Sequence, residues 1–375
     1  MEARTPRPGR SFLAWLEARV NLTEIVSFLS VFGLRPTELD TRKPLREALS
    51  EALRQPLPSY ARWPRVLGIL SFLLFLFLGV TGMMLAFYYQ PTADTAYGSI
   101  MLIARDVAFG SLIHQVHRWA ATLFLVILAL RVVRFFFSGL YGRGREVIWL
   151  VAVGTFAFAA FADLTGLLLP WDEQGYWTIV RAREVFDALP LIGPLFAFLV
   201  GGRGLDSLVL TRFYVLHIAV YPFALLALFY LHFASVRRVG MSSVPDAPTT
   251  RSLRVVMYDM LLVGLFLVGG LLTLAVLAPH PFGAAADPMS TPPGARPPWY
   301  LLAPYALLEA LPGFLPGFVR GLLLEGVFLG IVLVPFLDRS GGAGARGRAF
   351  FWIGAGLCLL WVLLTFAGWH MEGRR

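Results

Sequence analysis

Long runs of apolar residues alternate along this chain with short connections that carry arginine. A helix needs about 20 mostly apolar residues to cross the hydrocarbon core of a bilayer. Seven stretches meet or approach this length, and the sixth is the shortest. They are residues 66–88, 112–137, 147–169, 211–234, 255–278, 321–337 and 349–369. The pattern therefore predicts an all-α membrane protein with seven spans.

Two further apolar segments do not have the pattern of a span. Residues 12–34 place apolar side chains on one helical face and charged side chains on the other, which is typical of an amphipathic helix lying on the membrane surface. Residues 189–200 are apolar, but they are too few to cross a bilayer and two prolines interrupt them. We expect this second segment to be interfacial or re-entrant.

Composition and charge agree with this interpretation and exclude several classes. Hydrophobic residues make up 57% of the 375 residues and charged residues 15%, against about 25% charged in an average soluble domain. The net charge of +9 does not indicate nucleic-acid binding, because the arginines lie in loops between spans. A lone cysteine, Cys358, excludes an iron–sulfur site built from several cysteines.

The arginines also predict the orientation in the membrane. They concentrate in residues 1–65 and in the connections after the second, fourth and sixth predicted spans, all on one side of the membrane. Positively charged loops remain in the cytoplasm. We therefore expect a multi-pass protein of a bacterial plasma membrane, surrounded by lipid, with a cytoplasmic N-terminus and an external C-terminus.

Histidines lie at membrane depth in two of the predicted spans. Ionisable side chains inside spans are costly, and they are candidates for function. His117 lies early in the second span and His217 early in the fourth, so the two residues share one depth. His232 follows His217 by 15 residues, which is roughly 60° of rotation and about 22 Å of travel. Facing imidazoles at two levels are typical of stacked haems in a helical bundle.

The level of His232 lacks a second histidine. Arg131 stands at the matching position of the second span, and arginine is not an iron ligand. A planar haem packs against helices most closely where side chains are absent, and Ala152 stands where a further glycine would complete such a pattern. The glycines that support a haem are Gly68, Gly82 and Gly166. Close packing between membrane helices is the alternative explanation for them.

These residues resemble the cytochrome b/b6 family, the membrane core of quinol:cytochrome c and quinol:plastocyanin reductases. The most specific stretches are FGSLIHQVHRW (109–119), TGLLLPWDEQGYW (165–177), LTRFYVLH (210–217) and PPWY (297–300). The chain as a whole resembles cytochrome b6 fused to subunit IV. It divides on this basis into a cytoplasmic segment with the surface helix, 1–65, a four-helix haem domain, 66–240, and a domain of three further spans, 241–375.

The resemblance implies two haem b positions. His117 and His217 would ligate the iron of the outer haem, and His232 would ligate a second, inner haem iron if one is present. Three arginines would meet the haem propionates, namely Arg118, Arg134 and Arg212.

The resemblance also implies quinone sites and partner proteins. Residues 165–177 together with Pro298, Trp299 and Tyr300 would border an outer quinol-oxidising pocket, and Asp259 would lie near an inner quinone site. In the family, quinol gives one electron to a Rieske iron–sulfur protein and one to the outer haem. A Rieske protein and a c-type cytochrome would therefore be partner subunits, and family members form homodimers.

Three features depart from the family's pattern. Arg131 replaces the second inner histidine, Pro298 replaces the glutamate of PEWY, and no cysteine near the first span could attach a haem covalently. Asp163 and Glu325 would lie in the outer half of the bilayer, where either one could replace the missing proton acceptor as a catalytic group. The alternative is a structural carboxylate paired with an arginine such as Arg320.

Two functions are therefore compatible with the sequence. The first is a haem b electron-transfer subunit of a quinol-oxidising Rieske/cytochrome b respiratory complex. The second is a single-haem membrane anchor that conducts electrons between the quinone pool and another oxidoreductase, without bifurcation. Arg131 and Pro298 favour the second function, whereas the quinol-site stretches and Asp259 favour the first.

Overall fold

The computed structural model describes residues 22–23, 40, 42–54, 66–142, 144–201, 204–239, 253–338 and 344–371. Within these ranges the chain folds into helices and no β-strand forms, which confirms the all-α prediction. The surface helix predicted for residues 12–34 lies outside the described residues, apart from 22–23.

Seven helices of the described chain are long and apolar enough to cross a membrane, in agreement with the seven predicted spans. Each observed span begins and ends within two residues of its predicted limits, except that the fourth and sixth begin four residues earlier than predicted and the fifth begins five residues later. The spans are Leu67–Ala86, Gly110–Phe137, Glu146–Leu168, Ser207–Val236, Met260–Leu277, Gly317–Leu337 and Gly347–His370.

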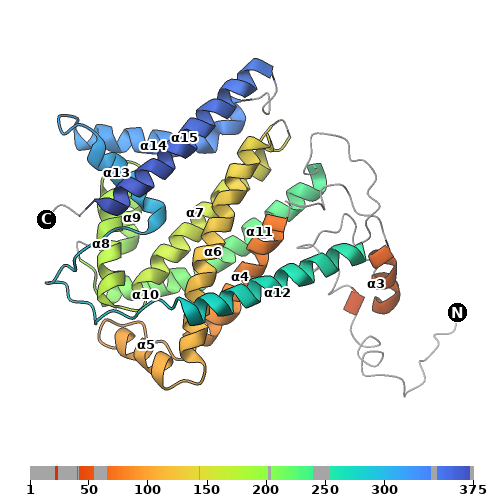
Figure 1. Cartoon of the computed structure of the whole chain (residues 1–375), viewed down its shortest axis with the longest axis horizontal. Coiled ribbons are helices and arrows are strands. Elements are labelled where there is room, and N and C mark those ends of the chain that lie inside the picture. Colours follow the sequence, from red (N-terminus) through yellow and green to blue (C-terminus); the bar gives the residue numbers. More distant parts are fainter. Residues whose placement is uncertain are drawn as a thin grey trace.

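A bundle of helices carries the histidines. The helix α6 packs against α4 and α7, and α11 packs against α7 and also reaches α4, where its Phe229 meets Phe72 and Phe75 (Figure 1). The bundle consists of α4 (Val66–Ala86), α6 (Gly110–Phe137), α7 (Glu146–Leu168), α10 (Ser207–Val215), a π-helical turn η3 (Leu216–Val220) and α11 (Tyr221–Val239).

Shorter helices cover the end of the bundle where α6 begins. They are α5 (Ala96–Arg105), α8 (Glu173–Asp187) and α9 (Gly193–Val200). The short helix α9 lies within the segment for which the sequence predicts an interfacial or re-entrant structure. Asp172 caps the N-terminus of α8, because its Oδ1 accepts a hydrogen bond of 2.7 Å from the Gly175 amide.

The remaining helices pack around this bundle. Helix α12 lies against α4 and α6, α14 lies against α7, and α13 packs on α15 (Figure 1). These elements are α12 (Leu253–Leu277), a 3₁₀ turn η4 (Trp299–Leu301), α13 (Leu302–Ala310), α14 (Gly317–Leu337) and α15 (Gly344–His370).

Three clusters of buried apolar side chains form the interior. One joins α5, α7, α8 and α10, the second lies in the middle of the bundle, and the third lies where α6 ends and α7 begins. Large apolar side chains also cover the outside of α12 and α15, among them Phe266 at 79% exposed and Phe366 at 67%. Apolar residues on both the inside and the outside are what a bilayer requires.

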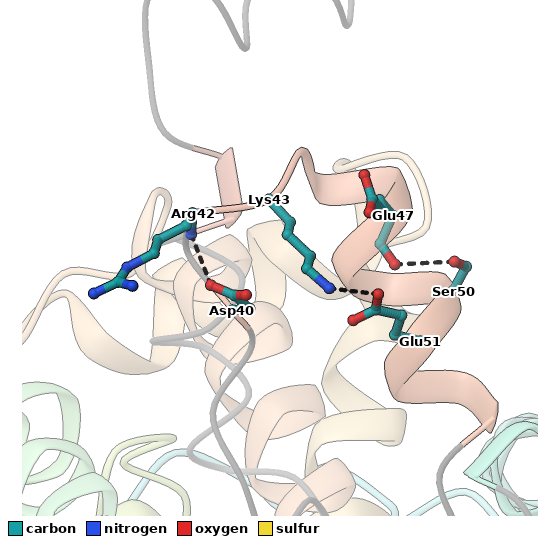
Figure 2. A network of polar contacts seen from close by, with 6 residues as sticks. All are labelled: Asp40, Arg42, Lys43, Glu47, Ser50 and Glu51. Carbon is teal, nitrogen blue, oxygen red and sulfur yellow. Dashed lines mark hydrogen bonds and ion pairs between the residues drawn. The ribbon is translucent and has the colours of Figure 1, made fainter.

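Helix α3 (Leu45–Arg54) packs against α12 and carries a polar surface. Lys43 forms an ion pair of 2.5 Å with Glu51, and the Ser50 hydroxyl donates to the Glu47 carbonyl (Figure 2). The Arg42 amide donates to Asp40 at the start of this segment (Figure 2). These polar side chains are exposed, so the segment presents a solvated polar face. Exposed ion pairs of this kind add little stability.

Candidate functional site

Two of the predicted site histidines face one another inside the bundle. His117 comes from the second turn of α6 and His217 from η3, and their ring centroids are 6.1 Å apart with an angle of 69° between the planes. Residues exactly 100 positions apart in the chain are therefore brought together at one level of the bundle, as their shared depth predicts. We call this the His117 level.

A π-helical turn presents His217 to the bundle. The Tyr221 amide donates to the Leu216 carbonyl, one residue further back than in an α-helix. Pro222 follows directly, and a proline ring in a regular helix clashes with the carbonyl four residues earlier. Single π-turns occur frequently at functional sites, and this one contains His217.

The structure fixes the protonation of both imidazoles at the His117 level. The His217 Nδ1 lies 2.8 Å from the Ala162 carbonyl oxygen, which can only accept, so Nδ1 carries the proton. The His117 Nδ1 lies 2.8 Å from the Thr81 hydroxyl, whose own proton is donated to the Phe77 carbonyl. Both Nε2 atoms therefore keep a lone pair, as a metal ligand must.

Two glycines lie directly against these rings. A Cβ added to Gly166 would approach the His217 Cε1 to 2.6 Å, and one added to Gly82 would approach the His117 Cε1 to 3.2 Å. Both predicted glycines thus have a steric reason to lack a side chain. Two imidazoles with free Nε2 atoms, held by acceptors at Nδ1 and cradled by glycine, fit a bis-histidine haem.

The level of His232 has a different construction. His232 stacks on Phe135 with ring centroids 6.1 Å apart, and its buried Nδ1 has no hydrogen-bond partner among the described residues. Arg131 is buried, donates to the Ser71 hydroxyl at 3.4 Å and lies over the Phe135 ring at 5.5 Å. Outside the backbone of its own helix, no atom of the described residues lies within 4 Å of a Cβ added to Gly68.

These residues do not fit a second bis-histidine haem. All six histidines of the chain are known from the sequence, and Arg131 occupies the position opposite His232. A haem-ligating histidine is normally oriented by a hydrogen bond at its other ring nitrogen, and the described part of the chain offers His232 none. Ala152, where a glycine was expected from the pattern, is buried in the cluster beside Phe135.

The three arginines predicted to meet haem propionates are in different environments. Arg118 follows His117 on α6, and its charge acts on Asp163 and Asp172. Arg134 lies one turn beyond Arg131 on the same helix. The Arg212 guanidinium is directed toward the end of α9, where it donates to the Val200 carbonyl at 3.2 Å.

The PPWY stretch forms the turn before α13 and contacts α7. The Tyr300 hydroxyl lies 3.0 Å from the Asp163 Oδ2 and 3.1 Å from the Ala160 carbonyl oxygen. Burial and the negative charge of Asp163 hold the pKa of Tyr300 well above its usual value. Pro298 begins the turn with a φ of −61°, and the Trp299 ring lies 5.6 Å from that of Tyr300.

The other two predicted acids differ from Asp163. Glu325 Oε1 accepts hydrogen bonds from the Leu191 and Ile192 amides at 2.9 and 2.8 Å, so it holds the chain at the start of α9. It makes no ion pair with Arg320, which instead donates to a carbonyl of α13. Asp259 belongs to α12, and its side chain lies outside the described part of the protein.

Sequence reasoning missed the groups that orient the imidazoles. They are the Thr81 hydroxyl and the Ala162 carbonyl, with the Thr165 hydroxyl 3.5 Å from the His217 Nδ1. The sequence did contain a signal for the threonines, because a threonine directly precedes each glycine that lies against an imidazole, at residues 81–82 and 165–166. A backbone carbonyl has no sequence signature.

The loop after α12 is fastened across α6, close to His117. The Gln115 side chain donates to the His280 carbonyl at 2.9 Å and accepts from the His280 amide at 2.8 Å. Burial, with a smaller effect of the Arg118 charge, lowers the pKa of His280 to about 4. This loop therefore carries a neutral imidazole at neutral pH.

The fold and the histidine pair define a multi-pass helical membrane protein with a bis-imidazole site. Two family models match the chain: "Cytochrome b/b6/petB" over residues 54–240 and "Cytochrome b(C-terminal)/b6/petD" over residues 285–373. The cytochrome b6 of Prochlorococcus marinus (strain MIT 9515) is 38% identical over 177 residues, which are 47% of this chain and 81% of that protein.

Further comparisons agree. The cytochrome b6 of Oltmannsiellopsis viridis is 35% identical over 204 residues, which are 54% of this chain and 95% of that protein. A solved structure titled "Hyperthermophilic respiratory Complex III" superposes with a TM-score of 0.71 over 96% of this chain and 97% of that one, at 23% identity. The last likeness is one of fold.

The chain belongs to the cytochrome b family, in its form that joins b6-like and subunit IV-like regions. It is accordingly a haem b-binding, membrane-spanning electron-transfer subunit of a bc-type complex, and it acts together with other subunits of that complex.

Proposed function

We propose that this chain oxidises quinol near the outer face of a bacterial plasma membrane and carries one haem b at the His117 level. The observation that carries the proposal is the pair of opposed imidazoles with both Nδ1 protons fixed and both Nε2 atoms free. The arginine-rich connections support a cytoplasmic N-terminus. That orientation puts the His117 level in the outer half of the bilayer.

Different residues of this chain would hold the iron, orient the imidazoles and leave space beside the rings. His117 and His217 would hold the iron, and a haem bound there supplies a one-electron acceptor. Thr81 and the Ala162 carbonyl keep the two imidazoles in the ligating tautomer. Gly82 and Gly166 keep side chains away from the rings.

The quinol pocket would be bordered by residues 165–177 and by the turn at 298–300. Tyr300 ties this turn to α7, one residue away from the carbonyl that orients His217. The distance for electron transfer from quinol to the haem would then be short, because the quinol pocket and the haem site share α7. A Rieske iron–sulfur protein would take the other electron, and a c-type cytochrome would follow it.

A second function is favoured by the construction around His232. Arg131 and the unpartnered Nδ1 of His232 do not provide a second bis-histidine haem. A chain with one haem would serve as a membrane anchor and electron conductor for another oxidoreductase. In that case quinol need not be oxidised at the outer pocket.

The haem b content per chain and its reduction by quinol test these proposals together. We expect one haem b per chain in the purified complex, reduced rapidly by decylubiquinol and blocked by an inhibitor of outer-site quinol oxidation. The variant R131H restores a histidine opposite His232, and we expect it to add a second haem with its own midpoint potential. The control R131Q removes the charge without adding a ligand and should still bind one haem.

The outcomes separate the two functions. One haem that quinol does not reduce, or whose reduction resists the inhibitor, supports the anchor. Two haems in the unaltered chain contradict the single-haem proposal and show that His232 ligates iron without a second histidine.

A further inference from the structure

Asp163 and Tyr300 form a hydrogen-bonded pair beside the haem site. Asp163 lies in a membrane-spanning helix, where a carboxylate is costly and usually has a function. Its Oδ2 is 3.0 Å from the Tyr300 hydroxyl, and no described residue hydrogen-bonds to its other oxygen, Oδ1. The Oδ1 atom is not among the buried unpartnered atoms of the described chain, and the Asp163 side chain is partly exposed. One oxygen is therefore anchored and the other remains accessible.

The Tyr300 hydroxyl has two acceptors for one proton. It lies 3.0 Å from the Asp163 Oδ2 and 3.1 Å from the Ala160 carbonyl oxygen. When Asp163 is ionised, the hydroxyl can donate to the carboxylate. When Asp163 is protonated, the hydroxyl can turn to Ala160 and accept from the carboxyl group. Both protonation states of Asp163 are thus hydrogen-bonded without movement of the backbone.

The surroundings couple this pair to the electron acceptor. Asp163 follows Ala162, whose carbonyl oxygen orients His217, and it comes three residues before Gly166, which lies against the same ring. The Arg118 charge, next to His117, acts on Asp163. A group in this position can take up a proton near the atom that receives the electron.

The other candidates for this role are not suited to it. The Glu325 Oε1 accepts from two backbone amides, and its buried Oε2 has no hydrogen-bond partner within the described ranges. Pro298 has no group that can accept a proton. Among the three positions at which the sequence raised the question, the geometry favours Asp163.

We propose that Asp163, positioned by Tyr300, accepts a proton from the hydroxyl of the quinol that is oxidised at this site. This inference rests on the proposed quinol oxidation. Conversion of one quinol to quinone breaks two O–H bonds and releases two protons and two electrons. His117 and His217 would hold the haem, which supplies the acceptor for one electron, and the iron–sulfur partner would take the other. One proton passes to the Asp163 carboxylate, and the second leaves to water at the outer surface.

The test is the rate at which decylubiquinol reduces the haem in the intact complex, measured by stopped flow from pH 5 to 9. We expect D163N to slow this reduction by about 10²-fold at neutral pH, the scale of a lost general base. The rise of the rate with pH should disappear in this variant. D163E should restore part of the rate. Y300F should keep the carboxylate but shift the pH at which the rate is half-maximal.

An infrared difference spectrum gives a readout that does not depend on turnover. A carboxyl band that changes on haem reduction should be present in the unaltered complex and absent in D163N. The matched control is D187N, which removes an exposed carboxylate on α8 that is paired with Arg183. It should leave the rate, the pH profile and the infrared band unchanged.

The outcomes distinguish this inference from the proposed function. If quinol does not reduce the haem in the unaltered complex, the proposed function is wrong. If quinol reduces it and D163N keeps the rate and its pH profile, only the role of Asp163 is wrong. If D163N does not assemble, Y300F decides, because a purely structural tyrosine would leave the pH profile in place.

Discussion

Single glycines control the space beside the two imidazoles for which we propose haem ligation. We expect G166A to displace His217, because the new methyl group would lie 2.6 Å from the His217 Cε1 and its neighbours are ring atoms. Haem b content per chain should fall by more than half. The pyridine haemochrome of the purified protein measures this content.

A glycine on the same helix supplies the control. G154A adds a methyl group whose nearest neighbour is a flexible leucine atom at 4.0 Å, so haem content should be unchanged. Equal haem loss in both variants would mean that α7 tolerates no added volume anywhere. The contact with His217 would then not be the cause.

The pairing of residues at the two levels explains their different chemistry. Thr81 and the Ala162 carbonyl give each imidazole at the His117 level an acceptor, whereas His232 has an aromatic neighbour and a buried cation nearby. An imidazole without an oriented partner is a weaker metal ligand. One substitution at position 131 thus changes the electrostatics as well as the number of ligands.

At the level of helices, Glu325 joins α14 to the start of α9. We expect E325A to lower the free energy of unfolding by about 2 kcal/mol, because two backbone amides lose a charged acceptor. E325Q keeps an oxygen in the same place and should lose less than half as much. Thermal unfolding in detergent measures the stability, and limited proteolysis between 189 and 200 measures the local effect.

This prediction also tests how the two intramembrane acids divide their roles. If E325A left stability unchanged but altered the pH profile of haem reduction, Glu325 would be the proton acceptor and the assignment to Asp163 would be wrong. The helix geometry leads us to expect the reverse, since α9 begins directly after the two amides that Glu325 binds.

For the whole molecule, the loop around His280 makes stability depend on pH. The pKa of His280 is about 4 in the folded protein and near 6.5 in the unfolded chain, so the unfolded state binds more protons between these values. Stability should therefore be complete above about pH 6.5 and fall as the pH is lowered toward 4. The melting temperature measured across this range should show the decline.

The variant H280Q removes this titrating group and should make the pH dependence shallower. The Gln115 contacts involve only the backbone of residue 280, so they can persist in the variant. An unchanged slope in H280Q would assign the acid sensitivity to other groups. The loop joins α12 to the turn that carries Tyr300. Loosening of the loop should therefore also weaken the contacts between residues 66–240 and residues 241–375.

Residues 66–240 and residues 241–375 are also joined by two backbone hydrogen bonds. The Glu173 amide donates to the Ala284 carbonyl at 2.8 Å, and the Ala286 amide donates to the Trp171 carbonyl at 3.0 Å. The loop that leads to the PPWY turn is therefore hydrogen-bonded to the residues that follow α7. This arrangement positions Tyr300 against α7, although 137 residues separate it from Asp163.

Apolar run lengths and helical periodicity were enough to predict the spans, the shared depth of His117 and His217, and the lack of a second histidine opposite His232. Spans follow from the length of apolar runs, and the depth of a residue follows from its place within a span, because a bilayer imposes one axis on every helix. Helical periodicity alone was enough to predict that Arg131 lies on the same face of its helix as His117, at the level of His232. The resemblance of the motifs to cytochrome b/b6 then indicated the family, which the comparisons confirmed.

Contacts between individual groups could be learned from the three-dimensional packing and not from the sequence. The carbonyl that orients His217, the two acceptors of the Tyr300 hydroxyl and the amides bound by Glu325 all come from segments far apart in the chain. Backbone carbonyls and amides exist at nearly every residue, so the sequence carries no mark of the ones that are used. Asp163 and Glu325 are equivalent in the sequence as intramembrane acids. They differ in the structure because Asp163 contacts the Tyr300 hydroxyl, whereas Glu325 binds two backbone amides at the start of α9.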